Sequence, residues 1–267
     1  MKVSVVTVCF NSARTIGHTL ESFFGQDHQQ KELVIIDGGS SDATLDIVRR
    51  FPQDDIRIFS EPDRGIFDAM NKGLDRFTGE AVGYLNSDDR FHDGGVLSAV
   101  SAALDRADIV FGDIDFVSDH DSGRVVRRWR STPYRRGAFA SGWMAPHPSL
   151  YVQRRVANAV GTFDLRYRIS ADYDWMLRAF ELHGFTALLE RRVFTDMMVG
   201  GNSTGGGLRT YVKGNLESLH SRQRWLGAGP IDYALFAKPL GKVLQFHHSW
   251  NGPNPWRRSP MAVGSRD

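Results

Sequence analysis

The sequence predicts an α/β protein with a mostly parallel, doubly wound sheet, helices on both faces of the sheet, and further helices toward the C-terminus. In the first part of the chain, short β-rich apolar runs alternate with segments of helical periodicity. This strand-helix-strand order implies parallel strands joined by right-handed crossovers. The composition is that of an ordinary globular protein, because 267 residues with 41% hydrophobic and 24% charged side chains can bury one large core or divide into two.

Four buried strands are predicted in this part of the chain. They span residues 3–10, 32–36, 56–59 and 81–85, and the intervening helices begin after Ser12 as N-cap, include residues 45–48 and span residues 66–77. Right-handed crossovers place the C-terminal ends of all these strands at one edge of the sheet. Polar residues gather at this edge, at 7–11, 37–41, 61–64 and 87–89, which predicts a ligand site there.

The alternation of strands and helices ends near residue 107. Residues 108–117 and 125–129 flank the turn-rich DHDSG and predict a hairpin, and residues 149–152 predict another strand. A helix is expected over residues 170–182. A mobile glycine-rich loop at 200–207, helices at 208–226 and 231–247, and a Pro-rich basic tail are expected to follow.

Charge, cysteine content and hydropathy narrow the class of protein. A formal net charge of +2 gives no argument for nucleic acid as a partner. Cys9 is the single cysteine, so it cannot form an intramolecular disulfide and fits a small buried side chain in a reducing compartment. The N-terminal apolar run is too short to span a membrane and lacks a small-residue cleavage site. With no longer apolar segment elsewhere, the sequence predicts a cytoplasmic protein.

The stretch Asp37-Gly-Gly-Ser-Ser-Asp42 follows the second predicted strand and opens a helix. Its glycines allow a tight turn, and Asp37 at the strand end can accept hydrogen bonds from a base or a ribose. An ordinary strand-to-helix turn capped by Asp and Ser has the same pattern. Because no Gly-x-Gly-x-x-Gly follows the first strand and no Gly-Lys-Ser/Thr occurs, neither a dinucleotide fingerprint nor a P-loop is supported.

Two other carboxylate pairs are candidates for chemistry. Asp88 and Asp89 follow a buried strand, and Mg²⁺ or Mn²⁺ commonly pairs one or two carboxylates with substrate phosphate oxygens. A solvated loop or a helix cap is the alternative. Asp172 and Asp174 lie at a helix start, where a partly desolvated carboxylate could act as a general base, although the helix dipole favours acidic residues there in any case. Spacing alone leaves both interpretations open.

Five motifs follow one another along residues 1 to about 200: SVVTVCFNSARTIGHTLESFFGQ, LVIIDGGSSDATLDIV, DRGIFDAMNKGL, GEAVGYLNSDD, and HPSLYVQRR with GTFDLRYRISADYDWMLR. Together they resemble the family 2 glycosyltransferases, which have the GT-A fold and transfer sugars with inversion. The subgroup that looks most similar comprises bacterial exopolysaccharide, O-antigen and glycolipid transferases like the colanic-acid enzymes. The resemblance implies a GT-A catalytic domain at 1–205, with a nucleotide-sugar-binding half at 1–106 and an acceptor-binding half at 107–205, and a C-terminal helical extension with a basic tail at 206–267.

The resemblance assigns donor-binding and metal-binding roles at the sheet edge. It implies that the donor contacts Thr7, Asn11, Asp37, Asp68, Lys72, Asp88 and His147. Thr7 and Asn11 would lie at the edge of the nucleotide and Asp37 at its base or ribose. Lys72 could equally be a surface lysine, and His147 could equally be structural. Asp88-Asp89 would be the acidic metal motif, with Asp89 the direct ligand of Mn²⁺ or Mg²⁺.

The catalytic base implied by the resemblance is Asp172. Family members often have Ala-Glu-Asp-Tyr-Asp where this chain has Ser170-Ala-Asp-Tyr-Asp174, so Ala171 replaces a common Glu. Asp174 would project from another side of the helix and serve as a structural partner. Processive members carry Gln-x-x-Arg-Trp, but in Ser221-Arg-Gln-Arg-Trp225 the Gln and Arg are adjacent, which implies transfer of one sugar per encounter.

The expected function is transfer of a sugar from a UDP- or GDP-sugar to a hydroxyl of a lipid-linked or glycan acceptor, in bacterial cell-surface polysaccharide or glycolipid synthesis. A nucleotidylyltransferase and a non-catalytic nucleotide-sugar binding module are the alternatives. Basic and aromatic residues at 222–225, 233–250 and 256–258 also predict peripheral contact with the inner face of the plasma membrane. A helix packed on the core with a solvated tail is the alternative to that contact.

Overall fold

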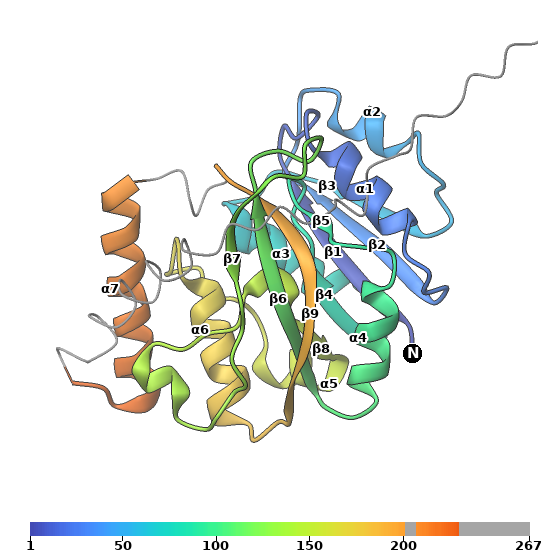
Figure 1. Ribbon diagram of the computed structural model, residues 1–267. Helices are drawn as coiled ribbons and strands as arrows, with labels where there is room; N and C mark the ends of the chain where they lie inside the picture. The colour runs from blue at the N-terminus through green and yellow to red at the C-terminus, as the bar shows by residue number, and fades with distance from the viewer. Residues whose placement is uncertain (201–206, 230–267) are drawn as a thin grey trace, which may run out of the picture.

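The computed structural model describes residues 1–200 and 207–229, which form a twisted sheet covered by helices (Figure 1). Its strands are β1 (Val3–Cys9), β2 (Lys31–Asp37), β3 (Ile56–Ser60), β4 (Ala81–Tyr84), β5 (Arg90–Phe91), β6 (Ile109–Val117), β7 (Val125–Trp129), β8 (Tyr151–Gln153) and β9 (Ala187–Met198). The helices are α1 (Ile16–Phe24), α2 (Thr44–Val48), α3 (Ile66–Arg76), α4 (Val96–Leu104), α5 (Arg154–Val160), α6 (Ala171–Leu177) and α7 (Gly207–Leu226). The strand order is β3-β2-β1-β4-β8-β6-β9-β5, and β7 pairs with β6.

The N-terminal part of the sheet is parallel, as predicted. β1 lies between β2 and β4, and β3 extends the sheet beyond β2. The strands β1 and β2 are rich in Val and Ile and are buried on both faces, which is the pattern expected where crossover helices cover a parallel sheet. The predicted α/β fold is therefore confirmed, and the predicted strand bounds differ from the observed ones by a residue or so.

Helices cover both faces of the sheet, and neighbouring residues of one strand point into different cores. Val5 of β1 packs into the core beneath α1 and α4, whereas Val6 packs into the core beneath α3 and α6. Ile35 and Ile36 of β2 divide in the same way. This alternation follows from the period of two in a strand, and it fixes the register of the central strands relative to both helical layers.

The second part of the sheet is mixed. β8 pairs antiparallel with β4 and β6, the predicted hairpin of β6 and β7 is present, and β9 runs parallel to β6. β9 is not predicted from the sequence, because residues 190–192 interrupt the apolar pattern and most of the strand is half-buried. Pairing with β6 along nearly its whole length makes this segment a strand, so tertiary context overrides local propensity here.

The structure also tests the predicted helix bounds and the predicted helix cap. Ser12 is not a side-chain cap of α1; its backbone carbonyl accepts hydrogen bonds from Thr15 and Ile16, and the helix begins at Ile16. The helix predicted over 170–182 is present as α6 followed by a π-helical turn at Arg178–Leu182. The helix predicted over 208–226 is α7. The predicted helix at 231–247 and most of the predicted loop at 200–207 lie outside the described residues.

Figure 1 shows α6 and α7 side by side at one end of the sheet. The contact is a buried one, because the side chains of Ser221 and Arg222 on α7 are at most 1% exposed. Within the described part of the chain, no helix has both the length and the hydropathy required to cross a membrane.

Candidate active site

The loops that follow β1, β2 and β4 are hydrogen-bonded to one another at the carboxyl edge of the sheet. The Asn11 backbone N–H donates to Ser40 Oγ at 2.8 Å, and the Ser41 N–H donates to Asn11 Oδ1 at 2.9 Å. The hydroxyl oxygens of Ser12 and Ser87 are 2.9 Å apart and share a hydrogen bond. The predicted clustering of polar residues at this edge is therefore present, and it includes the loop that carries Asp88 and Asp89.

Asp37, at the end of β2, is fully buried and organises the loop that follows it. Its Oδ2 atom accepts hydrogen bonds from Ser60 Oγ at 2.6 Å, from the Ser40 N–H at 3.0 Å and from the Gly39 N–H at 3.2 Å. Burial acts to raise the pKa of Asp37, but the hydrogen bonds from Ser40 and Ser60 outweigh it and hold the pKa below its usual range. Asp37 is therefore a buried anion at the sheet edge.

Two further residues predicted to contact the donor lie at the end of β1, and their surroundings differ. Thr7 is fully buried and donates to the Leu85 carbonyl at 2.7 Å, so its hydroxyl is engaged inside the protein. Asn11 is exposed and has a φ angle of +50°, in the left-handed region that asparagine tolerates better than most residues. This conformation lets both the backbone and the side chain of Asn11 bond to the loop after β2.

Asp88 and Asp89 are neighbouring carboxyl groups, and the hydrogen bonds that they accept offset only part of the cost of ionising both. Asp89 is 1% exposed, and its carboxylate accepts from the Met198 N–H at 3.2 Å and from Asn86 Nδ2 at 3.1 Å. Burial raises the pKa of Asp88, and burial together with the negative charge of Asp88 raises the pKa of Asp89 well above its usual range. A cation bound to this pair would offset the repulsion and favour the ionised form.

The main chain of the Asp88-Asp89 loop is held from two sides. Thr19 Oγ1 on α1 donates to the Asp89 carbonyl at 2.6 Å. His120, in the turn between β6 and β7, makes a 2.7 Å hydrogen bond through Nε2 to the Asp88 carbonyl, and since a carbonyl only accepts, Nε2 is the protonated nitrogen. Neither contact was predicted, because both join residues that are far apart in the sequence.

The oxygen atoms at this loop fit a hard divalent cation whose remaining ligands come from a substrate. In residues 1–200 and 207–229, no group of three or more His, Cys, Asp or Glu side chains is arranged to hold a metal ion. Mg²⁺ and Mn²⁺ do not need such a cage when phosphate oxygens complete the shell. Asn86 Oδ1 is also buried and has no hydrogen-bond partner there, which leaves an uncommitted oxygen near the two carboxylates.

The predicted residues on α3 lie beside the sheet edge and already have protein partners. Arg64 binds the Asp68 carboxylate at 3.0 Å through its guanidinium, and hydrogen bonds from Arg64 lower the pKa of Asp68. Lys72 Nζ lies 2.8 Å from the Pro62 carbonyl and 3.4 Å from the Glu61 carboxylate. Asp68 and Lys72 are four residues apart, so they lie one turn apart on the same face of α3.

The two acidic residues of α6 have different surroundings. Asp172 is half-buried, and its Oδ1 accepts from the Tyr173 N–H at 2.8 Å. Asp174 is 1% exposed and binds Arg178 at 2.9 Å, while Ser221 and Trp225 of α7 donate to its other oxygen at 2.8 and 2.9 Å. These contacts agree with the structural role predicted for Asp174 and leave Asp172 as the more accessible carboxylate.

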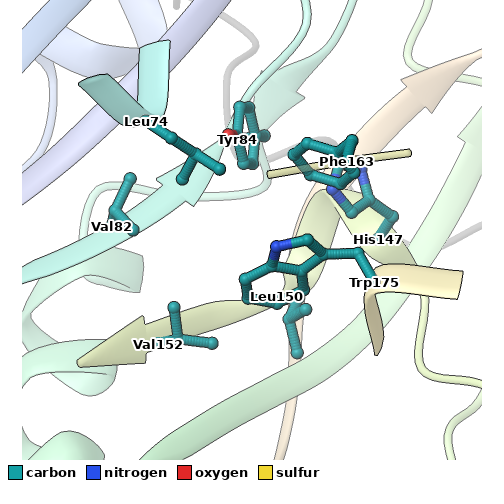
Figure 2. A pocket seen from close by; sticks show the side chains of 8 residues that line it. All are labelled: Leu74, Val82, Tyr84, His147, Leu150, Val152, Phe163 and Trp175. Atoms are coloured by element: carbon teal, nitrogen blue, oxygen red, sulfur yellow. The ribbon is translucent and has the colours of Figure 1, made fainter. Parts of the chain in front are cut away.

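His147 is buried in an aromatic pocket, as Figure 2 shows. Its ring stacks on Tyr84 with centroids 5.2 Å apart and meets the edge of Phe163 at 5.9 Å. The pocket is lined by Leu74, Val82, Tyr84, His147, Leu150, Val152, Phe163 and Trp175. Burial lowers the pKa of His147, although the nearby negative charge of Asp172 acts in the opposite direction. Trp175 of α6 lines the same pocket, so α6 packs beside Tyr84, the last residue of β4.

The structure does not support the membrane contact predicted for residues 222–225, because two of these side chains have partners within the protein. The Arg222 side chain is 1% exposed and donates to Tyr173 Oη at 3.1 Å, and Trp225 Nε1 donates to Asp174. Arg224 is exposed but pairs with Asp164 at 2.9 Å. A basic, aromatic stretch has the same composition whether it faces lipid or a buried carboxylate. The predicted membrane segments at 233–250 and 256–258 lie outside the described residues.

The fold and the acidic loop after β4 define a sugar-transferring enzyme of the GT-A type, and comparison with known proteins identifies the family. Residues 4–149 match the family model described as Glycosyl transferase family 2. A PGL/p-HBAD biosynthesis glycosyltransferase of Mycobacterium bovis is 31% identical over 189 residues, covering 66% of this chain and 69% of that protein. The putative teichuronic acid biosynthesis glycosyltransferase TuaG of Bacillus subtilis is 37% identical over 92 residues, covering 33% of this chain and 36% of that protein.

Solved structures agree on the fold. Staphylococcus aureus TarS 1–349 in complex with UDP-GlcNAc aligns with a TM-score of 0.62 and 17% identity, over 92% of this chain and 72% of that one. The chain spans 44% of the longer TarS structure. The mannosyltransferase PcManGT from Pyrobaculum calidifontis, in complex with GDP-Man and Mn²⁺, aligns with a TM-score of 0.61 and 20% identity, over 89% of this chain and 68% of that one. The chain belongs to glycosyl transferase family 2 and is a glycosyltransferase.

Proposed function

We propose that this glycosyltransferase moves one sugar from a nucleotide-diphosphate sugar to an acceptor hydroxyl with inversion, in the synthesis of a bacterial cell-surface polysaccharide or glycolipid. One observation carries the proposal: the buried anion Asp37 and the Asp88-Asp89 pair lie on hydrogen-bonded loops at one edge of the sheet, and α6 packs beside the end of β4 through Trp175. Such an edge is where open α/β sheets bind ligands.

The donor is proposed to be a UDP- or GDP-sugar held across the loops after β1 and β2. Asn11 and Asp37 would face the nucleoside, and Asp68 and Lys72 would lie beside it. Thr7 would act indirectly, because its buried hydroxyl ties the end of β1 to Leu85, at the start of the loop that carries Asp88. The solved relatives that bind UDP-GlcNAc or GDP-Man support the class of donor.

Mn²⁺ or Mg²⁺ is proposed as the cofactor, held by Asp89 and Asp88 together with the donor diphosphate. The cation would stabilise the charge that develops on the leaving diphosphate. Asp89 is the proposed direct ligand. Each Asp89 oxygen accepts one of the hydrogen bonds from Asn86 and Met198 and keeps a lone pair that could bind the ion, and Asp88 would contact the donor from the more accessible position.

Asp172 is proposed to be the general base. In a single inverting displacement, the acceptor hydroxyl gives its proton to the Asp172 carboxylate while its oxygen bonds to the anomeric carbon. The bond from that carbon to the diphosphate oxygen breaks at the same time, and the electron pair leaves with the diphosphate. The half-buried position of Asp172 supports this role, because a partly desolvated carboxylate is a better base than a fully hydrated one. His147 would support the site from within the aromatic pocket.

The proposed acceptor is a lipid-linked or glycan hydroxyl reached from the cytoplasm, with peripheral membrane contact through segments beyond residue 229 and no role for nucleic acid. The names of the relatives, PGL/p-HBAD and teichuronic acid biosynthesis glycosyltransferases, support this class of acceptor. A nucleotidylyltransferase is less well supported, because Val8-Cys-Phe-Asn-Ser-Ala-Arg14 offers no glycine for a phosphate loop. A non-catalytic binding module predicts binding without turnover.

The test is a nucleotide-release assay with UDP-glucose, UDP-N-acetylglucosamine and GDP-mannose, each with a polyprenyl diphosphate-linked sugar and MnCl₂, followed by mass spectrometry of the product. We expect one added sugar, whose anomeric configuration, determined by NMR, is inverted relative to the donor, and an Asp172→Asn enzyme slowed about 10²- to 10⁴-fold. Retained configuration would exclude the single displacement. Conversion of the donor to UTP or GTP and a sugar 1-phosphate on addition of pyrophosphate would indicate a nucleotidylyltransferase, and tight nucleotide binding without any release would indicate a binding module.

A further inference from the structure

A carboxylate on α7 binds the backbone of the segment that leads into α6. Glu217 accepts three consecutive backbone hydrogen bonds, from the N–H groups of Arg168 at 3.1 Å, Ile169 at 2.8 Å and Ser170 at 2.9 Å. Hydrogen bonds from amides to an ionised carboxylate are among the stronger ones in proteins. Helix α6 has no side-chain cap at Ser170, and Glu217 instead holds the three residues that lead into the helix.

The two helices also fit together closely around this anchor. Ser170 Oγ donates to the Gly214 carbonyl at 2.9 Å, one turn before Glu217 on α7. A Cβ atom at Gly214 would lie 3.1 Å from Ile169 Cγ2 and 3.3 Å from Ser170 Oγ, which is tighter than an ordinary contact. One turn after Glu217, Ser221 donates to Asp174. One face of α7 therefore holds residues 168–174 at several successive points.

We propose that Glu217 is a positioning residue for catalysis: by fixing residues 168–170, it sets where α6 begins and therefore where the Asp172 carboxylate stands relative to the acceptor. The proposal rests on the proposed function, in which Asp172 is the base. Asp172 is two residues beyond the last peptide bound by Glu217, and a displacement of about 1 Å at a reacting group can cost on the order of 10²-fold in rate. Glu217 itself does not touch the reacting atoms.

The chain contains a matched control for this proposal. Glu181 is a second partly buried carboxylate that accepts from backbone amides, from the Gly137 N–H at 2.9 Å and from the Phe139 N–H at 3.3 Å. Its partners belong to the turn at 137–139, whose Phe139 carbonyl accepts from the Tyr173 hydroxyl, and not to the backbone that precedes Asp172. Loss of Glu181 removes the same kind of interaction from the fold, so the two variants separate a general loss of stability from a loss of positioning.

The experiment compares Glu217→Ala, Glu217→Gln and Glu181→Ala in the full chain, with and without Asp172→Asn. Turnover is measured with UDP-glucose, UDP-N-acetylglucosamine and GDP-mannose and the polyprenyl diphosphate-linked sugar, and UDP and GDP binding is measured by calorimetry with MnCl₂. We expect Glu217→Ala to lower kcat about 10- to 100-fold with nucleotide affinity unchanged. Glu217→Gln should keep part of the rate, because its amide oxygen still accepts, and Glu181→Ala should keep kcat near normal.

The decisive readout is the combination with Asp172→Asn. If Glu217 acts through Asp172, Glu217→Ala should cost little further rate in that background. An undiminished cost there, or equal kcat values for Glu217→Ala and Glu181→Ala, would overturn the positioning role while leaving the proposed function intact. A normal kcat for Asp172→Asn alone would overturn the base assignment and the positioning role together. Should Glu217→Ala not fold, the same comparisons hold for Glu217→Gln.

Discussion

Replacing Asp174 by alanine should destabilise the fold rather than remove a catalytic group. The change leaves Arg178, whose side chain is 12% exposed, without the carboxylate that it binds at 2.9 Å. Breaking a buried ion pair by removing one partner costs about 3–5 kcal/mol. Arg178 still donates to the carbonyls of Val160 and Thr162, so we expect a cost near the lower end, about 3 kcal/mol in the free energy of unfolding.

For a chain of this size, 1 kcal/mol corresponds to about 2–4 °C in Tm, so the expected fall is about 6–12 °C. Thermal unfolding followed by circular dichroism measures it, with Asp172→Asn as the matched control that should keep its Tm. Asp174→Asn should have a smaller effect, because its carbonyl can still accept from Ser221 or Trp225. An Asp174→Ala protein with unchanged Tm and no activity would refute this reasoning and make Asp174 the base.

Three further outcomes follow from the structure. Activity should disappear in excess EDTA and return with MnCl₂, and Asp89→Asn should lose this response; full turnover in EDTA would exclude a metal role. Burial acts to raise the pKa of Glu32, but hydrogen bonds from Lys2, Ser4 and Thr78 outweigh it and lower the pKa to about 2. The ionised Glu32 should therefore contribute about 3 kcal/mol to the free energy of unfolding above pH about 4.3, and this contribution should vanish as the pH falls toward 2. Denaturant titrations should accordingly show Glu32→Gln and the unchanged protein converging in stability near pH about 2. Gly83→Ala should cost about 1–3 kcal/mol, because its Cβ would lie 2.3 Å from the Tyr151 ring; an unaltered Tm would contradict that clash.

The sequence predicted the N-terminal part of the fold because the signals there are local. Strands such as β2 are continuous apolar runs, and polar residues follow each one directly, so the topology alone brings Asp37 and Asp88 to one edge. β9 gave no such signal, since its pattern is set by pairing with β6. The sequence also did not predict that Thr7 and His147 are buried, because the same residue type at a strand end can face either a ligand or the core.

The predicted boundary at residue 205 illustrates the same limit. A glycine-rich stretch followed by a long helix is typical of a linker and an extension, and the sequence offers no sign that α7 packs against α6. In the structure, α7 buries Arg222 and Ser221 and supplies hydrogen bonds to Asp174 and to the segment before α6. A helix whose removal would leave the Asp174 carboxylate and three backbone amides without these partners cannot be separated from the core without large cost. For this reason we infer that α7 belongs to the catalytic unit, and that the unit extends at least to Leu226.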